Sequence, residues 1–179
     1  MILNTGLMFS SAFVRVNEDA TVTVITSITD HGTGNHTALC QIAAETLRIP
    51  LSRVRVGSQD SDTAPPDTGS IASRTIYDTG NAVRKAAEDV REQLIETAAD
   101  AFGCQPEQVV YGADKIYLRH DPDTSLSFAD VAAISFYAGE GPPLGRGSWL
   151  AKGPYARLPG RGFGEHPAAV YMFGTHVVE

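Results

Sequence analysis

The sequence predicts a mixed α/β domain in which two main helices pack on a sheet of mixed strands. Three observations predict it. Residues 11–16 and 21–26 are rich in β-branched and aromatic residues, two later segments repeat apolar residues at helical spacing, and short strand-like segments separate them. The order of hairpin, helix, strand, helix, strand, helix, strand is typical of helices layered on a sheet. The 179 residues are expected to form one domain, residues 1–179.

The first half of the chain begins with a predicted hairpin, because residues 17–20 supply turn residues between two strand-like segments. A first helix follows, and its apolar positions stop before Pro50. They are Leu39, Ile42, Ala43 and Leu47. The alternation of Arg and Val over residues 53–56 then predicts a short strand.

The second helix has the strongest periodic signal. Its apolar stripe begins near Ala82, and Gly103 supplies a C-terminal stop. The stripe comprises Val83, Ala86, Ala87, Val90, Leu94, Ala98 and Phe102. Residues 115–119 are expected to form a strand and residues 128–136 a short helix.

The C-terminal part is expected to differ in two ways. Residues 139–164 contain many glycines and prolines, which predicts an irregular loop region. Residues 168–178 form a long apolar run of β character, which predicts a buried strand. Because the sequence stops directly after this run, we expect a segment of something longer. An apolar strand left without neighbours also predicts a homo-oligomer.

Composition and charge exclude several classes of function. The formal net charge is −7, from 14 Lys and Arg against 21 Asp and Glu, and no basic cluster for nucleic acid is visible. No apolar stretch approaches the ~20 residues of a membrane helix, and no secretory signal is apparent. The two cysteines, Cys40 and Cys104, form no CxxC motif, which argues against disulfides and iron–sulfur ligation. A reducing cytoplasm is the expected compartment.

Two glycine-containing segments precede the predicted helices. Gly32-Thr33-Gly34 leads into the first helix, and residues 69–75 lead towards the second. Helix N-termini expose unpaired N–H groups, so two such starts could grip a pyrophosphate without a basic patch. The alternative is ordinary N-capping by Ser, Thr or Asn.

Several linked motifs in this region resemble the molybdenum-binding subunit of the xanthine dehydrogenase and aldehyde oxidase family. They occur in order at residues 34–50, 54–56, 60–70, 72–74 and 80–83. The hairpin before them and residues 173–179 resemble the flanking strands of the same family. The resemblance is dense from residue 11 to about 99 and thin from there to 168.

The resemblance implies a segment of a molybdenum hydroxylase that binds molybdopterin, either in its plain form or as its cytosine dinucleotide. Water would supply the oxygen inserted into an aldehyde or N-heteroaromatic carbon, and electrons would leave through iron–sulfur and FAD subunits or domains. The cofactor-binding residues that it implies are Gly32, Thr33, Gly34, Ala72, Ser73, Arg74 and Thr75. For Arg74, pairing with a cofactor phosphate and a structural salt bridge are both open.

The sequence departs from the family pattern at three positions. Thr33 stands in the place of a glutamine that approaches the metal's ligands, while Arg48 and Ala20 replace glycines in two turns. The family's catalytic glutamate belongs to a Gly-Glu-Pro segment that this sequence does not reach, so we expect no catalytic residue, no stoichiometric molybdenum and no hydroxylase activity in this chain alone. Two alternatives remain: a chain that completes a site with partners, and a non-catalytic binding module.

Other polar residues are expected to be structural. His31 and His36 are assigned polar-loop or capping roles, because their spacing does not suit a metal pair. Cys40 is expected to be a buried small hydrophobe. The aspartates Asp60, Asp62 and Asp67 are assigned to turns, since Pro65-Pro66 interrupts any Ca²⁺ loop. Glu165 is expected to be a solvated loop residue.

Overall fold

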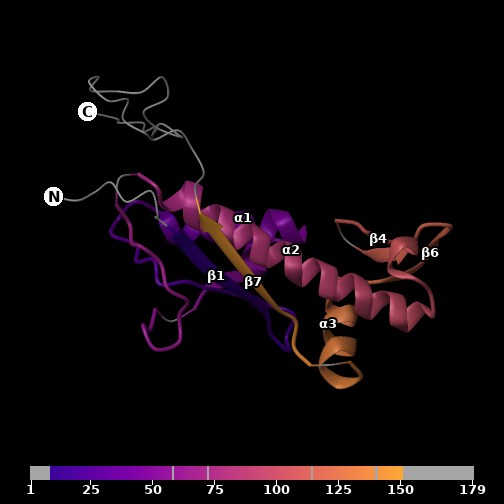
Figure 1. The fold of residues 1–179 in the computed structure, drawn as a ribbon. Helices are drawn as coiled ribbons and strands as arrows, with labels where there is room; N and C mark the ends of the chain where they lie inside the picture. The colour runs from indigo at the N-terminus through magenta and orange to yellow at the C-terminus, as the bar shows by residue number, and fades with distance from the viewer. Residues whose placement is uncertain (1–8, 58, 72, 114, 140, 151–179) are drawn as a thin grey trace, which may run out of the picture.

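The computed structural model describes residues 9–57, 59–71, 73–113, 115–139 and 141–150. These residues form a four-stranded sheet, a three-stranded sheet and three α-helices (Figure 1). The larger sheet has the order β3-β2-β1-β7, with β1 Phe9–Val16, β2 Val22–Ile25, β3 Val54–Val56 and β7 Leu144–Leu150. The smaller has the order β4-β5-β6, with β4 Val109–Tyr111, β5 Ile116–Leu118 and β6 Asp121–Leu126. The helices are α1 Asn35–Leu47, α2 Thr75–Phe102 and α3 Phe128–Tyr137. The predicted mixed α/β class is confirmed.

Most of the predicted elements form where the sequence places them. The hairpin is the antiparallel pair β1 and β2, and β3 joins β2 in parallel after the crossover helix α1. The strand predicted at 115–119 is β5, and the short helix is α3. The strand predicted at 168–178 lies outside the described residues.

The core lies between the larger sheet and its helices. Alternate residues of β1, from Ser10 to Val16, are buried and face α2, which also contacts β7 and α1. The second helix begins at Thr75, seven residues before the predicted stripe. The apolar pattern does not reveal these first two turns, because several of their buried residues are polar. Gly103 ends it in the left-handed conformation with φ 66°, as predicted. The far end of α2 contacts α3 and the smaller sheet (Figure 1).

The irregular loop predicted at residues 139–164 is wrong over part of its length. Residues 144–150 form β7, which pairs antiparallel with all but the last residue of β1. Its glycines are required by close packing: a Cβ on Gly145 would lie 1.9 Å from the carbonyl oxygen of Ala86, and one on Gly147 1.9 Å from that of Ala82. The glycines therefore let a helix rest on a strand backbone, whereas their number alone suggests a loop. Residues 151–164 lie outside the described residues.

The two glycine replacements noted in the sequence fall at left-handed turns. Ala20 in the hairpin turn has φ 59°, and Arg48 at the C-cap of α1 has φ 52°. Glycine adopts this conformation without the penalty that a Cβ brings. Both replacements act on local backbone geometry, as expected.

Candidate cofactor-binding site

The two glycine-containing loops lie at the same end of the larger sheet. The parallel strands β2 and β3 both end there, and the chain continues from them towards α1 and α2 respectively. The antiparallel strand β1 starts at that end, and its first residue, Phe9, accepts a hydrogen bond from Arg74, the N-cap of α2. The topology thus excludes the arrangement in which the loops cap helices at opposite ends of the sheet. Ligands of open α/β sheets bind at the carboxyl ends of parallel strands.

The loop before α1 is organised around one carboxylate. Asp30 Oδ1 accepts hydrogen bonds from the backbone N–H groups of Gly32, Thr33 and Gly34, at 3.0, 3.1 and 3.2 Å. Its Oδ2 accepts another from the N–H of His36 at 3.3 Å. Gly32 and Gly34 have φ values of 99° and 74°, and these left-handed residues let successive N–H groups point to one side. The amides predicted to hold phosphate therefore already hold an anion of this chain.

The electrostatics of Asp30 agree with that arrangement. Desolvation raises the pKa of the carboxyl, but the N–H groups of His36, Gly32 and Gly34 lower it, and the net pKa lies below the ordinary value of 3.8. Asp30 is accordingly a carboxylate at neutral pH. The other groups of the loop are exposed, and no described group donates to the carbonyl oxygens of Gly32 or Thr33.

The loop before α2 is organised around a buried guanidinium. Arg74 Nε donates to Asp78 at 2.8 Å, and its Nη1 donates to Asp67 and to the carbonyl oxygen of Gly69, both at 2.8 Å. Its Nη2 donates to the carbonyl oxygen of Phe9 at 2.9 Å and to the Ser10 hydroxyl at 2.7 Å. A guanidinium has five N–H donors, and five acceptors are present here. Of the two alternatives for Arg74, a cofactor phosphate or a structural salt bridge, the structure contains the salt bridge.

The two carboxylates beside Arg74 are unequally supported. Asp67 accepts additional hydrogen bonds from the N–H of Gly69 at 2.8 Å and from the Thr79 hydroxyl at 3.1 Å. Asp78 Oδ1 is buried and has no hydrogen-bond partner among the described residues. Burial raises the pKa of Asp78, the nearby charge of Asp67 adds to this, and the hydrogen bond and charge of Arg74 oppose it.

The backbone directly before α2 has a positive φ at a residue that is not glycine. Ser73 has φ 62°, and the hydroxyls of Thr75 and Ser70 lie 2.8 Å apart. The predicted site residue Ala72 lies outside the described residues. Contact of Gly32, Thr33, Gly34, Ser73, Arg74 and Thr75 with a cofactor stays a prediction.

Residues 59–65, which precede the second loop, contact the chain on either side of the first loop. The Gln59 amide lies in hydrogen-bond contact with the carbonyl oxygen of Ile28 and with the His36 ring, beside the start of α1. Further along, the Ser27 hydroxyl donates to the carbonyl oxygen of Pro65 at 2.9 Å. One continuous segment thus runs from the first loop to the second.

Several structural assignments made from the sequence are confirmed. The His36 ring nitrogen lies 3.0 Å from the carbonyl oxygen of Ile28, Cys40 is buried, and Asp60 accepts from the N–H of Asp62 in a turn. Burial raises the pKa of the Cys40 thiol. Asp67 is more than a turn residue, because it is part of the buried ion-pair cluster. Among the described residues, no group of three or more His, Cys, Asp or Glu side chains is placed to hold a metal ion, and none of the described helices is long and apolar enough to span a membrane.

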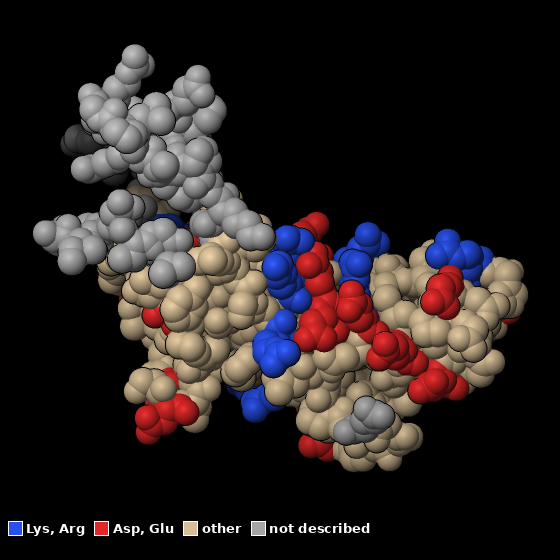
Figure 2. Space-filling view, viewed as in Figure 1, with Lys and Arg blue, Asp and Glu red and all other residues tan. Residues whose placement is uncertain are grey.

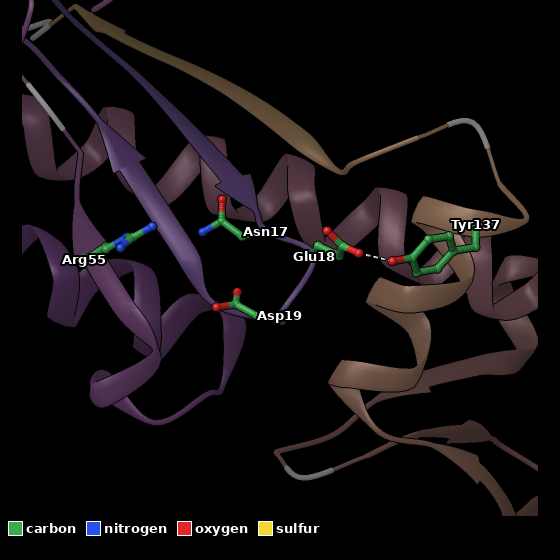
Figure 3. Close-up of a pocket in the computed structure, with 5 residues that line it drawn as sticks. All are labelled: Asn17, Glu18, Asp19, Arg55 and Tyr137. Atoms are coloured by element: carbon green, nitrogen blue, oxygen red, sulfur yellow. Dashed lines mark hydrogen bonds between the residues drawn. The ribbon is translucent and has the colours of Figure 1, made fainter.

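One hollow of the described surface lies elsewhere. It measures about 610 Å³ and is lined by Asn17, Glu18, Asp19, Arg55 and Tyr137 (Figure 3). The hairpin turn between β1 and β2 supplies three of these residues, so the hollow lies at the opposite end of the sheet from the loops. We assign the candidate site to the loops, because the sequence motifs and the two helix starts lie at the same end of the sheet.

Several large apolar side chains are exposed at the end of the sheet that carries the loops. Phe9 and Leu150 pair across β1 and β7, and both are exposed. Ile71 and Ile76, on either side of Arg74 in the sequence, are exposed as well. Charged side chains gather over α2 and the smaller sheet, whereas the surface over β1 and the adjoining part of β7 is largely uncharged (Figure 2). Such a surface is typical of a region that another domain covers.

Comparison with known proteins decides the family. The model of the molybdopterin cofactor-binding domain matches residues 2–179, nearly the whole sequence. The chain belongs to this family. Within it, the chain is related to proteins of the xanthine dehydrogenase and aldehyde oxidase type.

Individual relatives of this cofactor-binding domain are much longer proteins. The chain is 34% identical over 134 residues to a putative xanthine dehydrogenase molybdenum-binding subunit of Escherichia coli, covering 74% of this chain and 18% of that protein. It is 36% identical over 119 residues to a nicotinate dehydrogenase subunit of Pseudomonas putida, covering 66% and 10%. The chain therefore spans less than a fifth of the length of these curated relatives.

Solved structures show the same fold. CO dehydrogenase from Oligotropha carboxidovorans matches with a TM-score of 0.76 at 22% identity, covering 80% of this chain and 18% of that one. Quinoline 2-oxidoreductase from Pseudomonas putida 86 matches with a TM-score of 0.72 at 25% identity, covering 80% and 19%. The resemblance inferred from the motifs is thus confirmed.

Sequence reasoning missed the residues that organise the two loops. Asp30, Asp67 and Asp78 hold the backbone and the guanidinium, yet none was predicted as part of the site. For Asp30 a signal was present, since an aspartate two residues before a glycine commonly accepts from the following N–H groups. For Asp78, the i,i+4 spacing from Arg74 predicts a pair on one helix face.

Proposed function

We propose that this domain forms one wall of the molybdopterin site in a larger molybdenum hydroxylase subunit. The observation that carries the proposal is the match of the cofactor-binding family model over residues 2–179, together with the position of both motif loops at the same end of the sheet. Among the described residues, Phe9, Leu150, Ile71 and Ile76 expose apolar side chains at that end, as expected where the rest of a subunit would dock. The alternative, a non-catalytic binding module, has no observation in its favour.

The residues that would line the cofactor are Gly32, Thr33, Gly34, Ala72, Ser73, Arg74 and Thr75. Thr33 is exposed and would present its hydroxyl and its carbonyl oxygen, to which no described group donates. Arg74 is buried, so its part would be to hold the loop that ends at Ser73 in place. When bound, molybdopterin carries the molybdenum at which water-derived oxygen is transferred to substrate.

The reaction proposed for the complete enzyme is hydroxylation of an aldehyde or an N-heteroaromatic carbon, with water as the oxygen source. Relatives named for xanthine, nicotinate and aldehyde substrates support this range of substrates. Iron–sulfur and FAD subunits or domains would accept the electrons. We further propose a cytoplasmic location, the cytosine dinucleotide form of the pterin, and self-association through the apolar strand predicted at residues 168–178.

Two measurements test the proposal. Metal analysis of the complete subunit, expressed together with its neighbouring genes, should find about one molybdenum per polypeptide, and denaturation should release a pterin nucleotide. The complete subunit should also reduce a dye when supplied with aldehydes or azaheterocycles. The chain of 179 residues alone should hold no stoichiometric molybdenum. A complete subunit without molybdenum and without oxidation of any such substrate would overturn the proposal.

A further inference from the structure

The loops that the sequence predicts to grip a pyrophosphate are already satisfied by carboxylates of this chain. At the start of α1, four backbone N–H groups point to Asp30, at 3.0–3.3 Å. At the start of α2, all five donors of Arg74 are bound to internal acceptors, two of them carboxylates. A phosphate at the first loop, or at the guanidinium of Arg74, would first have to displace an acceptor of this chain.

We propose that Asp30 closes the Gly32–Gly34 loop to anions, so that the phosphates of the cofactor are held outside this loop. This inference rests on the proposed function, and it corrects the expectation that these N–H groups bind phosphate. Asp30 is a positioning residue in this sense: it shapes the loop and excludes anions from it, without contacting the reacting atoms.

Two physical arguments and one observation support closure. An attached carboxylate loses far less freedom on binding than a free phosphate, so it competes for the same N–H groups at an advantage. Its negative charge at the helix start neutralises the partial positive charge that would attract a second anion. No described Lys or Arg side chain forms an ion pair with Asp30 and so competes with the N–H groups for its carboxylate, since the three ion pairs of the described residues lie elsewhere.

Closure also changes what the loop can offer a ligand. With the N–H groups turned towards Asp30, the carbonyl oxygens of Gly32 and Thr33 have no partner among the described residues, and the Thr33 side chain is exposed. These are neutral groups. Any contact between this loop and a cofactor would therefore be made to an uncharged part of it.

The test uses the isotope-labelled chain and inorganic pyrophosphate, followed by NMR of the backbone amides. In the wild-type chain, the amide signals of Gly32, Thr33 and Gly34 should not move on addition of pyrophosphate. In Asp30→Ala the freed amides should shift in a saturable way, with affinity about tenfold or more above that of the wild type, because several N–H groups gain a charged acceptor.

The matched control is Asp19→Ala, which removes the same charge from an exposed turn whose carboxylate accepts from Thr21 at the other end of the sheet. It should leave the loop amides insensitive to pyrophosphate. A gain equal to that of Asp30→Ala would mean that net charge, and not closure, governs the response, and would overturn the proposal.

Two further results would overturn it: saturable shifts of the Gly32–Gly34 amides in the wild type, or an Asp30→Ala chain that folds and gains no pyrophosphate response. If Asp30→Ala does not fold, Asp30→Asn replaces it. Its remaining oxygen can keep the bonds from Gly32 to Gly34, so the pyrophosphate response should be confined to the His36 amide. An unresponsive His36 amide contradicts closure. Because no molybdenum cofactor is used, failure here is separate from failure of the proposed function.

Discussion

The loops before α1 and α2 are both held by hydrogen bonds to charged side chains, but the first loop is exposed and the second is organised around a buried side chain. At α1 an exposed loop turns its N–H groups onto one carboxylate, and its residues with positive φ are Gly32 and Gly34. At α2 a buried guanidinium binds two carboxylates and two carbonyl oxygens, and the residues with positive φ are Gly69 and Ser73. The first loop depends on local backbone geometry, whereas the second depends on contacts that join β1, the loop and the helix. We therefore expect changes at the second start to cost far more stability.

The largest effect should follow loss of the buried guanidinium. Arg74→Met leaves Asp67 and Asp78 buried beside each other without a cation, and it should lower the free energy of unfolding by about 3–5 kcal/mol. Chemical denaturation of the full chain measures this. Arg84→Met is the matched control, because Arg84 makes an exposed i,i+4 pair with Glu88 and should change stability by less than about 1 kcal/mol. Equal effects at the two positions would contradict the comparison.

The two carboxylates beside Arg74 should differ in how much stability is lost when each is replaced. Asp67→Asn weakens bonds from Arg74, Gly69 and Thr79, and should cost about 3 kcal/mol, the lower limit for breaking a buried pair. Asp78→Asn keeps an oxygen for Arg74 and removes a poorly solvated charge, so its effect should stay within about 1 kcal/mol. Denaturation curves of both variants at neutral pH test the order. A larger loss for Asp78→Asn would reverse it.

Stability should also depend on pH through Asp78. Its pKa is raised in the folded chain, so the folded state binds the proton more tightly than the unfolded state does. The resulting stability is fully present below the ordinary value of 3.8 and is lost as pH rises through the raised pKa. As pH rises through the raised pKa of Asp78, the unfolding free energy of the wild type should therefore fall relative to that of Asp78→Asn. Parallel profiles of unfolding free energy against pH for the two proteins would contradict the prediction.

The smallest effect is expected at the exposed loop. Gly34→Ala meets no atom within 4 Å, so its cost should come only from the left-handed backbone, about 1 kcal/mol. Thermal unfolding measures it, and Gly147→Ala provides the contrast, since its Cβ would lie 1.9 Å from the Ala82 carbonyl oxygen. If Gly34→Ala were as damaging as Gly147→Ala, the exposed loop would be under a constraint beyond its dihedral angle.

The same contrast explains what the sequence could predict. Periodicity located α1, α2, α3 and the hairpin, because each buries one regular face. It failed for β7, where Gly145 and Gly147 serve a contact with a helix about sixty residues away in the sequence. The ordered motifs located both loops, but not the aspartates that fill them. A hydrogen bond between Asp30 and its own loop is a local signal, whereas the cluster around Arg74 appears only once β1 and α2 meet.

The pairing of β1 with β7 has a consequence for how the chain folds during synthesis. The hydroxyls of Ser11 and Ser148 lie 3.2 Å apart although 137 positions separate them in the sequence. Such distant contacts are slow to form, because the entropy of closing a long loop is lost before the contact is gained. Until residue 150 has left the ribosome, one edge of β1 and the alanine face of α2 stay uncovered. A nascent chain halted after α3 would therefore expose the surfaces on which chaperones act and aggregates begin.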